Sequence, residues 1–297
     1  MRPPQVPEQS GGEPPSRRGR PPEPIDEMAG KTHRTWLEPV RSRLTESGLT
    51  LDDLVGRSGY SKAQLSKLLR GKGYYPGWEI TYSVVRALDI PVDPTRRLWT
   101  AAAVEAAKDA AWIQKRLGDV PQSGLEEQPL AHLGLTQAMW HPYVAYARAF
   151  LQSDHRAQQV VAETFDILWL TWDEATRSPN TPRHAWLLLR KRVISRAPQR
   201  PGGHPDLRAA AFSTVTQAGI GDLTERLARI DVVARFFDTV ACLPPDQLDV
   251  TVLRYLCGIR RDAVPGIVGL SPAITHSVDR HARGALQGLY PDTDTQE

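Results

Sequence analysis

Lysine and serine side chains alternate with leucines in the segment GYSKAQLSKLLRGKG, which runs from Gly59 to Gly73. Lysine ammonium groups donate hydrogen bonds to guanine acceptors or phosphate oxygens, and short side chains can contact the methyl group of thymine. The segment holds no histidine, cysteine or acid that would support acid–base or metal chemistry. These residue types therefore favour binding of a polyanion over catalysis.

Two short helices are predicted to position this segment. Thr50 is typical of a helix N-cap, and the two acids that follow Leu51 suit the positive end of a helix dipole. Gly59 permits the left-handed conformation that ends a helix, and Ser61 can cap a second helix that stops at Gly71. The inward residues of this second helix are leucines: Leu65, Leu68 and Leu69. A basic helix presented by a tight turn can enter a major groove about 12 Å wide.

Positive charge is concentrated around the same segment. The whole chain has a formal net charge of +3, whereas nine Lys and Arg but only four Asp and Glu lie between Lys31 and Lys72. This region therefore carries a surplus of five positive charges, more than the chain as a whole. Such a local surplus is typical of a surface that binds nucleic acid.

The two predicted helices resemble the helix-turn-helix of the XRE (Cro/repressor-like) family. The resemblance lies in the spacing Leu51-x-x-Leu54-x-x-x-x-Gly59-x-Ser61-x-x-x-Leu65-Ser66-x-x-x-x-Gly71 and extends over roughly residues 34–107. It implies that the base-reading side chains are Lys62, Ala63, Ser66 and Lys67. Candidates for contacts to the DNA backbone lie around them: Thr50, Arg57, Ser61, Arg70 and Lys72. A homodimer on a pseudopalindromic site is a further expectation, because this motif commonly binds as a two-fold dimer.

The remaining chain has apolar residues three and four apart, without sustained alternation of period two. We therefore predict an all-α fold, with an N-terminal helix-turn-helix bundle and two smaller helical domains joined by flexible linkers. The predicted segments are a disordered Pro/Arg-rich tail (1–30), a helix-turn-helix domain (31–115), a linker (116–140), a helical domain (141–197), a linker with a helix (198–230), a second helix-turn-helix domain (231–290) and a disordered tail (291–297). Within the first tail, Arg18-Gly19-Arg20-Pro21 resembles the core of an AT-hook, although the Pro and Arg bias of the tail favours a solvated linker.

The C-terminal half resembles bacterial sigma factors of the extracytoplasmic-function group. The segments ETFDILW and AWLLLRKRV look like the promoter-melting and polymerase-binding region, and LPPDQLDVTVLRYL with VGLSPAITHSVDRHARGAL looks like the −35-binding region. The chain departs from the family at Gln158 and Gln159, where acids are usual, and at His276 and Val278, where a basic pair is usual. The resemblance therefore implies a diverged sigma-like half, with core RNA polymerase as a candidate partner.

A second turn-and-cap signal occurs in this half. Gly269-Leu270-Ser271 repeats the glycine turn and hydroxyl cap of the first helix pair. The candidate second DNA contact comprises Ser271, Thr275, His276, Arg280 and Arg283. Another basic run, Arg190 to Arg196, ends a predicted helix, where cations can either contact DNA or simply complement the helix dipole.

No pattern for catalysis or metal binding was found in the sequence. It contains no phosphate-binding loop, GxSxG or HExxH motif, and Cys242 and Cys257 lack the spacing of a zinc module. We predict a protein that is not an enzyme, without catalytic residues, metal site or cofactor. No run approaches the roughly eighteen apolar residues of a membrane span, so we expect no membrane partner. The two cysteines fit a reducing compartment, and together with the expected DNA binding they favour a cytoplasmic, nucleoid-associated protein.

These observations favour a transcription regulator that binds double-stranded DNA sequence-specifically through the helix beginning at Ser61. Two alternatives stay open. The chain could be a working sigma factor that recruits RNA polymerase, or an adaptor whose sigma-like half binds another protein and whose DNA contact is incidental.

Overall fold

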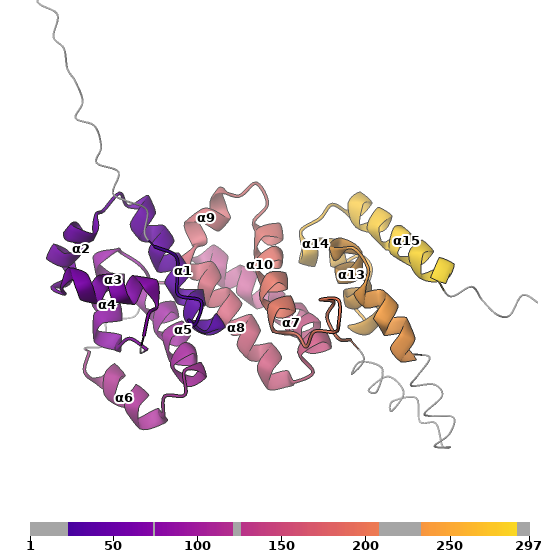
Figure 1. Ribbon diagram of the computed structural model, residues 1–297. Helices are drawn as coiled ribbons and strands as arrows, with labels where there is room; N and C mark the ends of the chain where they lie inside the picture. Colours follow the sequence, from indigo (N-terminus) through magenta and orange to yellow (C-terminus); the bar gives the residue numbers. More distant parts are fainter. Residues whose placement is uncertain (1–22, 74, 121–125, 208–232, 290–297) are drawn as a thin grey trace, which may run out of the picture.

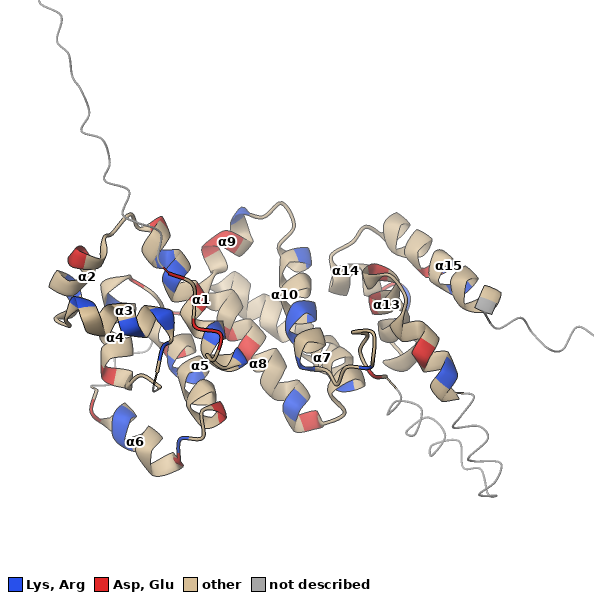
Figure 2. Cartoon of the chain, in the orientation of Figure 1, with Lys and Arg blue, Asp and Glu red and all other residues tan. Residues whose placement is uncertain are grey.

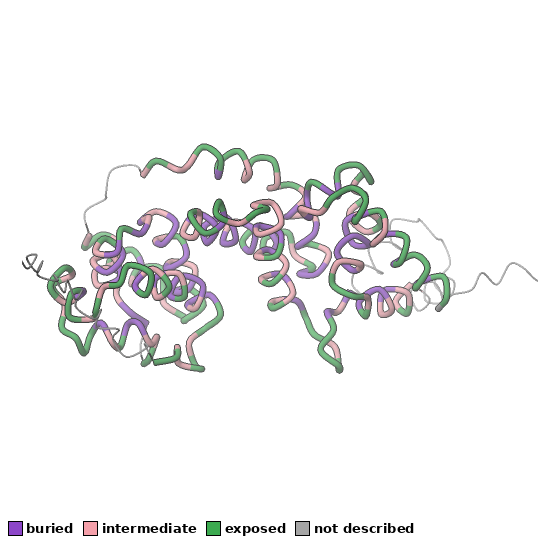
Figure 3. The backbone as a smooth tube through the Cα atoms, turned by 90° about the horizontal axis from the view of Figure 1, so that it is seen from above, coloured by how far each residue is buried: buried purple, intermediate pink, exposed green. Residues whose placement is uncertain are grey.

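The computed structural model describes residues 23–73, 75–120, 126–207 and 233–289. These residues are mostly helical and contain no sheet, which confirms the predicted all-α fold. The helices form an elongated row, with the N-terminal helices at one end and the C-terminal helices at the other (Figure 1). Buried residues follow this row along its length, and exposed residues cover its outside (Figure 3).

The N-terminal helices pack around one apolar cluster. They are α1 (Lys31–Glu46), α2 (Leu51–Ser58), α3 (Lys62–Arg70), α4 (Trp78–Ala87), α5 (Val92–Glu105) and α6 (Ala110–Gly118). Trp36 and Trp99 are fully buried in this cluster, and Trp78 is buried with them. The Tyr75 hydroxyl donates to the Trp99 carbonyl at 2.6 Å, and Trp99 Nε1 donates to the Pro76 carbonyl at 3.2 Å. These bonds attach the segment after α3 to the core.

The central helices begin earlier than the sequence predicted. They are α7 (Leu130–Leu151), α8 (Asp154–Leu170), α9 (Trp172–Arg177) and α10 (Thr181–Arg196). Residues 130–140, predicted to lie in a linker, instead form the first turns of α7. Pro129 stands at the N-cap, where a missing N–H does no harm, and buried His132 places Nε2 3.0 Å from the Phe165 carbonyl oxygen of α8. This tertiary contact outweighs the weak helix propensity of Gly134.

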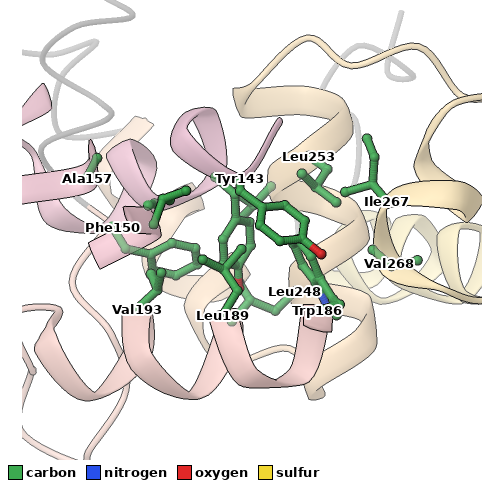
Figure 4. Packing of buried hydrophobic residues seen from close by; sticks show 14 of the residues in the cluster. Tyr143, Phe150, Ala157, Trp186, Leu189, Val193, Leu248, Leu253, Ile267 and Val268 are labelled. Atoms are coloured by element: carbon green, nitrogen blue, oxygen red, sulfur yellow. The ribbon is translucent and has the colours of Figure 1, made fainter. Parts of the chain in front are cut away.

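The C-terminal helices complete the core of the central helices. After a helical segment over 233–241 come α13 (Pro245–Thr251), the π-helical turn η1 (Val252–Leu256), α14 (Val264–Val268) and α15 (Pro272–Leu289). Figure 4 shows Leu248, Leu253 and Ile267 in one cluster with Tyr143 and Trp186 of the central helices. The sequence predicted two separate domains here. The short helices α13 and α14 offer too little apolar surface to form an independent core, so both regions share one.

A buried carboxylate ties three of these helices together. Asp249 of α13 accepts hydrogen bonds from the Tyr146 hydroxyl of α7 at 2.7 Å, from Trp186 Nε1 of α10 at 2.9 Å and from Arg190 Nε of α10 at 3.0 Å. Burial raises the pKa of the Asp249 carboxyl, while the neighbouring Arg190 guanidinium favours its ionised form. Arg190 is half-buried, and its guanidinium is paired with this buried carboxylate.

Ion pairs link α5 of the N-terminal helices to α8, and α8 to α10. Arg97 of α5 pairs with Asp166 of α8 at 2.6 Å. Glu163 of α8 is buried and pairs with Arg192 and Arg196 of α10 at 2.7 and 2.6 Å. The expectation that the basic end of α10 could contact DNA is therefore wrong for Arg190, Arg192 and Arg196, because all three neutralise buried carboxylates.

No helix within the described ranges is both long and apolar enough to cross a membrane. The AT-hook-like residues Arg18 to Pro21, most of the predicted linker 198–230 and the predicted tail 291–297 lie outside the described residues.

Candidate nucleic-acid interface

The first helix-turn-helix is shaped by two reciprocal caps. Thr50 Oγ1 accepts from the Asp53 backbone N–H at 3.2 Å, and the Asp53 carboxylate accepts from the Thr50 N–H at 2.8 Å. Ser61 and Gln64 form the same pair of bonds at the start of α3, at 3.4 and 3.0 Å. Each capping box satisfies two backbone donors that a helix N-terminus would otherwise leave unpaired. The predicted start of both helices is confirmed.

Glycines end both helices in the left-handed conformation. Gly59 has φ +75° and donates its N–H to the Val55 carbonyl at 3.0 Å, and Gly71 has φ +62°. A side chain at Gly59 would contact nothing within 4 Å, so the turn leaves open space around the leading end of α3. The predicted turn and the predicted end of α3 are confirmed.

The helix α3 divides into an inner and an outer face as predicted. Leu65, Leu68 and Leu69 are buried in the N-terminal cluster. Of the residues expected to read bases, Lys62, Ala63 and Lys67 are exposed, while Ser66 is half-buried. Figure 2 shows basic residues on α3, at the end of the molecule away from α15.

Lys62 forms an ion pair that is open to solvent. Its Nζ lies 2.9 and 3.0 Å from the two carboxylate oxygens of Asp52 on α2. The two side chains are 60% and 74% exposed, so solvent screens the pair and its contribution to stability is small. A phosphate or a guanine edge can therefore compete for the ammonium group.

The candidate backbone contacts differ in how they are engaged. The Thr50 and Ser61 hydroxyls already serve the capping boxes, and they donate to Asp53 and Gln64 at 2.6 and 2.8 Å. Arg57 donates weakly to the Ala87 carbonyl at 3.4 Å and, like Lys72, is exposed. Both cations are therefore open to an additional acceptor.

Arg70 is covered by a segment that the sequence predicted to be disordered. Glu23 pairs with the Arg70 guanidinium at 2.8 Å, and the Asp26 backbone N–H donates to the Arg70 carbonyl at 2.8 Å. Arg41 of α1 donates to the Glu23 carbonyl at 2.6 Å. Residues 23–30 therefore belong to the folded N-terminal module, which corrects the predicted boundary at residue 30. In the sequence, the acids of residues 23–30 stand next to a strongly basic domain, and this charge pattern could have indicated the contact.

The second helix-turn-helix repeats the local geometry. Gly269 has φ +66°, and the Ser271 hydroxyl accepts from the Ile274 N–H at 3.3 Å. Ser271, which precedes α15, is exposed, and so are His276, Arg280 and Arg283 on this helix. Thr275, however, is buried and donates to the Ser271 carbonyl at 3.0 Å. Its assignment as a DNA contact is wrong, because the side chain points into the fold.

A buried acid on the inner face of α15 was missed at the sequence level. Asp279 is 2% exposed, forms an ion pair with Arg254 of η1 and accepts from the Tyr255 hydroxyl at 3.2 Å. Arg283 Nε lies 3.8 Å from the same carboxylate. Burial and the Asp279 charge raise the pKa of Tyr255. The buried Asp279 carboxylate therefore partly neutralises two cations of this helix-turn-helix, Arg254 and Arg283.

The second turn is also packed against the central helices. Asn180 Nδ2 donates to the Gly269 carbonyl at 2.9 Å, and the Arg183 side chain donates to the Val268 carbonyl at 3.2 Å. A Cβ at Gly269 would lie 2.3 Å from the Arg183 backbone nitrogen. This turn is therefore fixed on α10, unlike the open turn at Gly59.

Catalytic and metal chemistry have few candidates here. Over the described residues, no three His, Cys, Asp or Glu side chains are grouped as they would be to hold a metal ion. Burial raises the pKa of the Cys257 thiol to about 12, so this thiol is a poor nucleophile at neutral pH.

None of the protein-family models, curated proteins or solved structures compared with this chain matches it.

Proposed function

We propose that the chain is a sequence-specific DNA-binding transcription regulator that reads duplex DNA with α3. The observation that carries this proposal is the outer face of α3, where Lys62, Ala63 and Lys67 are exposed on a helix whose inner face is fully buried. The helix is capped at its leading end and preceded by an open glycine turn, so it can be inserted as a preformed rod.

The chemistry of this face suits the major groove. Lysine can donate to O6 and N7 of guanine, the Ala63 methyl can contact the methyl group of thymine, and Ser66 can donate or accept at several base edges. Arg57 and Lys72 flank these residues and would contribute contacts to phosphate, which supply salt-dependent affinity without sequence preference. Binding, not catalysis, would be the mechanism.

The proposal is tested by direct binding measurements. Duplexes enriched from a random library by the wild-type chain would be labelled and titrated by fluorescence anisotropy at fixed salt. We expect Lys62→Ala/Lys67→Ala to raise Kd at least about 30-fold, because each of the two lost base contacts contributes about 1 to 3 kcal/mol. The matched control Lys115→Ala/Lys191→Ala removes two exposed lysines from α6 and α10 and should change Kd by less than about threefold.

Equal loss in both double variants would contradict the proposal, because it would show non-specific attraction of a polyanion. No enrichment of any duplex by the wild-type chain would also contradict it.

The sigma-factor alternative predicts a different result. A runoff transcription assay with purified core RNA polymerase would give promoter-dependent transcript if the C-terminal half recruited the enzyme. A regulator that acts through α3 alone gives none under these conditions. Unchanged DNA affinity after Lys62→Ala/Lys67→Ala would instead favour the adaptor alternative.

A further inference from the structure

A pocket of about 420 Å³ opens beside the C-terminal half of α3. It lies between α3, the start of α4 and the end of α6. Its volume is within the range of pockets that hold small organic molecules, about 300 to 1,000 Å³. No residue of this pocket except those on α3 and Lys72 has a part in the proposed DNA contact.

The pocket combines apolar walls with positive charge. Leu68, Pro76 and Ile80 contribute apolar surface, and the cations Lys67, Lys72 and Arg116 line the same space. Glu79 is the one acid among the described lining residues, so the lining carries a net charge of two positive units. An occupant that neutralises this charge and covers the apolar walls must be both anionic and partly apolar.

Arg116 is available to such an occupant. Its guanidinium pairs with Glu79 at 3.0 Å and lies 5.6 Å from the centre of the Trp112 ring. The side chain is 41% exposed, so an occupant of the pocket can reach it. The fork of a guanidinium can hold Glu79 and a second anion together, which a lysine in this place could not do with the same geometry.

The other pocket near this helix pair lacks these features. It measures about 200 Å³ and is lined by the cations Arg43 and Arg57 together with the acids Glu46 and Asp89. Its charges balance, so it offers no net attraction for an anion.

We propose that the pocket beside α3 binds an amphipathic organic anion, meaning a carboxylate, sulfonate or phosphate attached to an aromatic or acyl group. The anion is held by Arg116, Lys67 and Lys72, and its apolar part lies on Leu68 and Ile80. This anion also regulates the protein, a step that rests on the proposed function. Lys67 and Lys72 belong to the DNA surface, so a bound anion and DNA exclude one another, and each lowers the affinity for the other by the same factor.

The binding step is tested on the full-length chain with 8-anilinonaphthalene-1-sulfonate, whose fluorescence rises in apolar surroundings. N-phenyl-1-naphthylamine, which has similar rings without the sulfonate, serves as the neutral probe. We expect the sulfonate to bind more tightly, and Arg116→Ala to raise its Kd about tenfold, as loss of one charge-assisted contact does. Lys115→Ala, which removes the neighbouring exposed cation outside the pocket, should leave this Kd unchanged within about twofold.

A second variant tests the pocket independently, in case Arg116→Ala does not fold. Ile80→Trp fills the pocket from α4 without changing charge, and should also weaken the sulfonate. The circular dichroism melting curve of each variant establishes that it is folded. Equal affinity of wild type, Arg116→Ala and Ile80→Trp for the sulfonate would overturn the proposal.

The regulatory step is tested with the duplex that the wild-type chain enriches from the random library. We expect the sulfonate to release the duplex from the wild-type chain, and to do so about tenfold less effectively from Arg116→Ala, whose duplex affinity without sulfonate changes by no more than about threefold. If Arg116→Ala weakens duplex binding more than about tenfold, the pocket is a phosphate site of the DNA surface and the inference is overturned. Failure of the wild-type chain to bind any duplex would refute the proposed function, while the sulfonate measurements would still decide the binding site.

Discussion

The two helix-turn-helix elements share local geometry but differ in their surroundings. Both place a glycine with positive φ before a hydroxyl-capped helix. At the first, the turn is open and the lysines of α3 reach solvent. At the second, the turn presses on α10, Thr275 is buried and Asp279 holds nearby arginines. Local turn chemistry therefore does not establish a DNA-binding surface, because what surrounds the helix decides which side chains are presented.

The exposed apolar residue at the start of α15 sharpens this contrast. Ile274 is 52% exposed, whereas the corresponding residue of α3, three positions after the capping serine, is the polar Gln64. Isoleucine offers no hydrogen bond to a base edge and can meet only a thymine methyl. The leading face of α15 is therefore less suited to reading sequence than that of α3.

The largest expected change in the free energy of unfolding comes from breaking an ion pair in each of the two helix-turn-helix elements. Asp279→Ala leaves Arg254, which is 19% exposed, without its partner, and should lower the free energy of unfolding by about 3 to 5 kcal/mol. Asp52→Ala removes the exposed partner of Lys62 and should change it by no more than about 1 kcal/mol. Urea denaturation followed by circular dichroism measures both. Similar losses in the two variants would show that the second element is no more tightly built than the first.

A slightly smaller effect is expected from the two turn glycines. Gly269→Ala introduces a Cβ against the Arg183 backbone at positive φ, and should lower the free energy of unfolding by about 3 kcal/mol. Gly59→Ala also places a Cβ at positive φ, but this Cβ contacts no other atom. We therefore expect it to lower the free energy of unfolding by about 1 to 2 kcal/mol. The same denaturation experiment separates them. A loss at Gly59 equal to that at Gly269 would mean that the first turn is also enclosed.

Lowering the pH should lower the free energy of unfolding of the N-terminal helices, which include α3. His33 of α1 is stacked on Trp36 with ring centroids 5.1 Å apart, and burial lowers its pKa from 6.5 to about 4. Between these values the unfolded chain binds a proton that the folded chain does not, so stability is full above pH 6.5 and falls as the pH drops toward 4. We expect a loss of about 2 kcal/mol between pH 7 and pH 5.

The variant His33→Phe keeps an aromatic ring and removes the titration. Its free energy of unfolding should depend less on pH over this range, by about the same 2 kcal/mol. An unchanged pH dependence would show that another group causes the acid sensitivity.

Sequence reasoning succeeded where structure is encoded locally. The caps at Thr50 and Ser61 and the turns at Gly59 and Gly269 depend on residues within four positions, so residue type and spacing were sufficient. It failed where a distant partner decides the outcome. The burial of Asp279 depends on Arg254, and the folding of residues 23–30 onto α3 depends on Arg41 and Arg70. The helix over 130–140 was missed because Pro129 and Gly134 are typical of linkers. The contact of His132 with α8, which stabilises this helix, cannot be seen in the sequence.

The central claim is that α3, and not α15, selects the DNA sites of this protein. The most direct test maps bound sites across the genome for the intact chain, for Lys62→Ala/Lys67→Ala and for His276→Ala/Arg280→Ala, each at equal abundance in the cell. We predict that the first variant loses the specific sites and that the second keeps them. Retention of the sites by the α3 variant together with their loss from the α15 variant would contradict the claim.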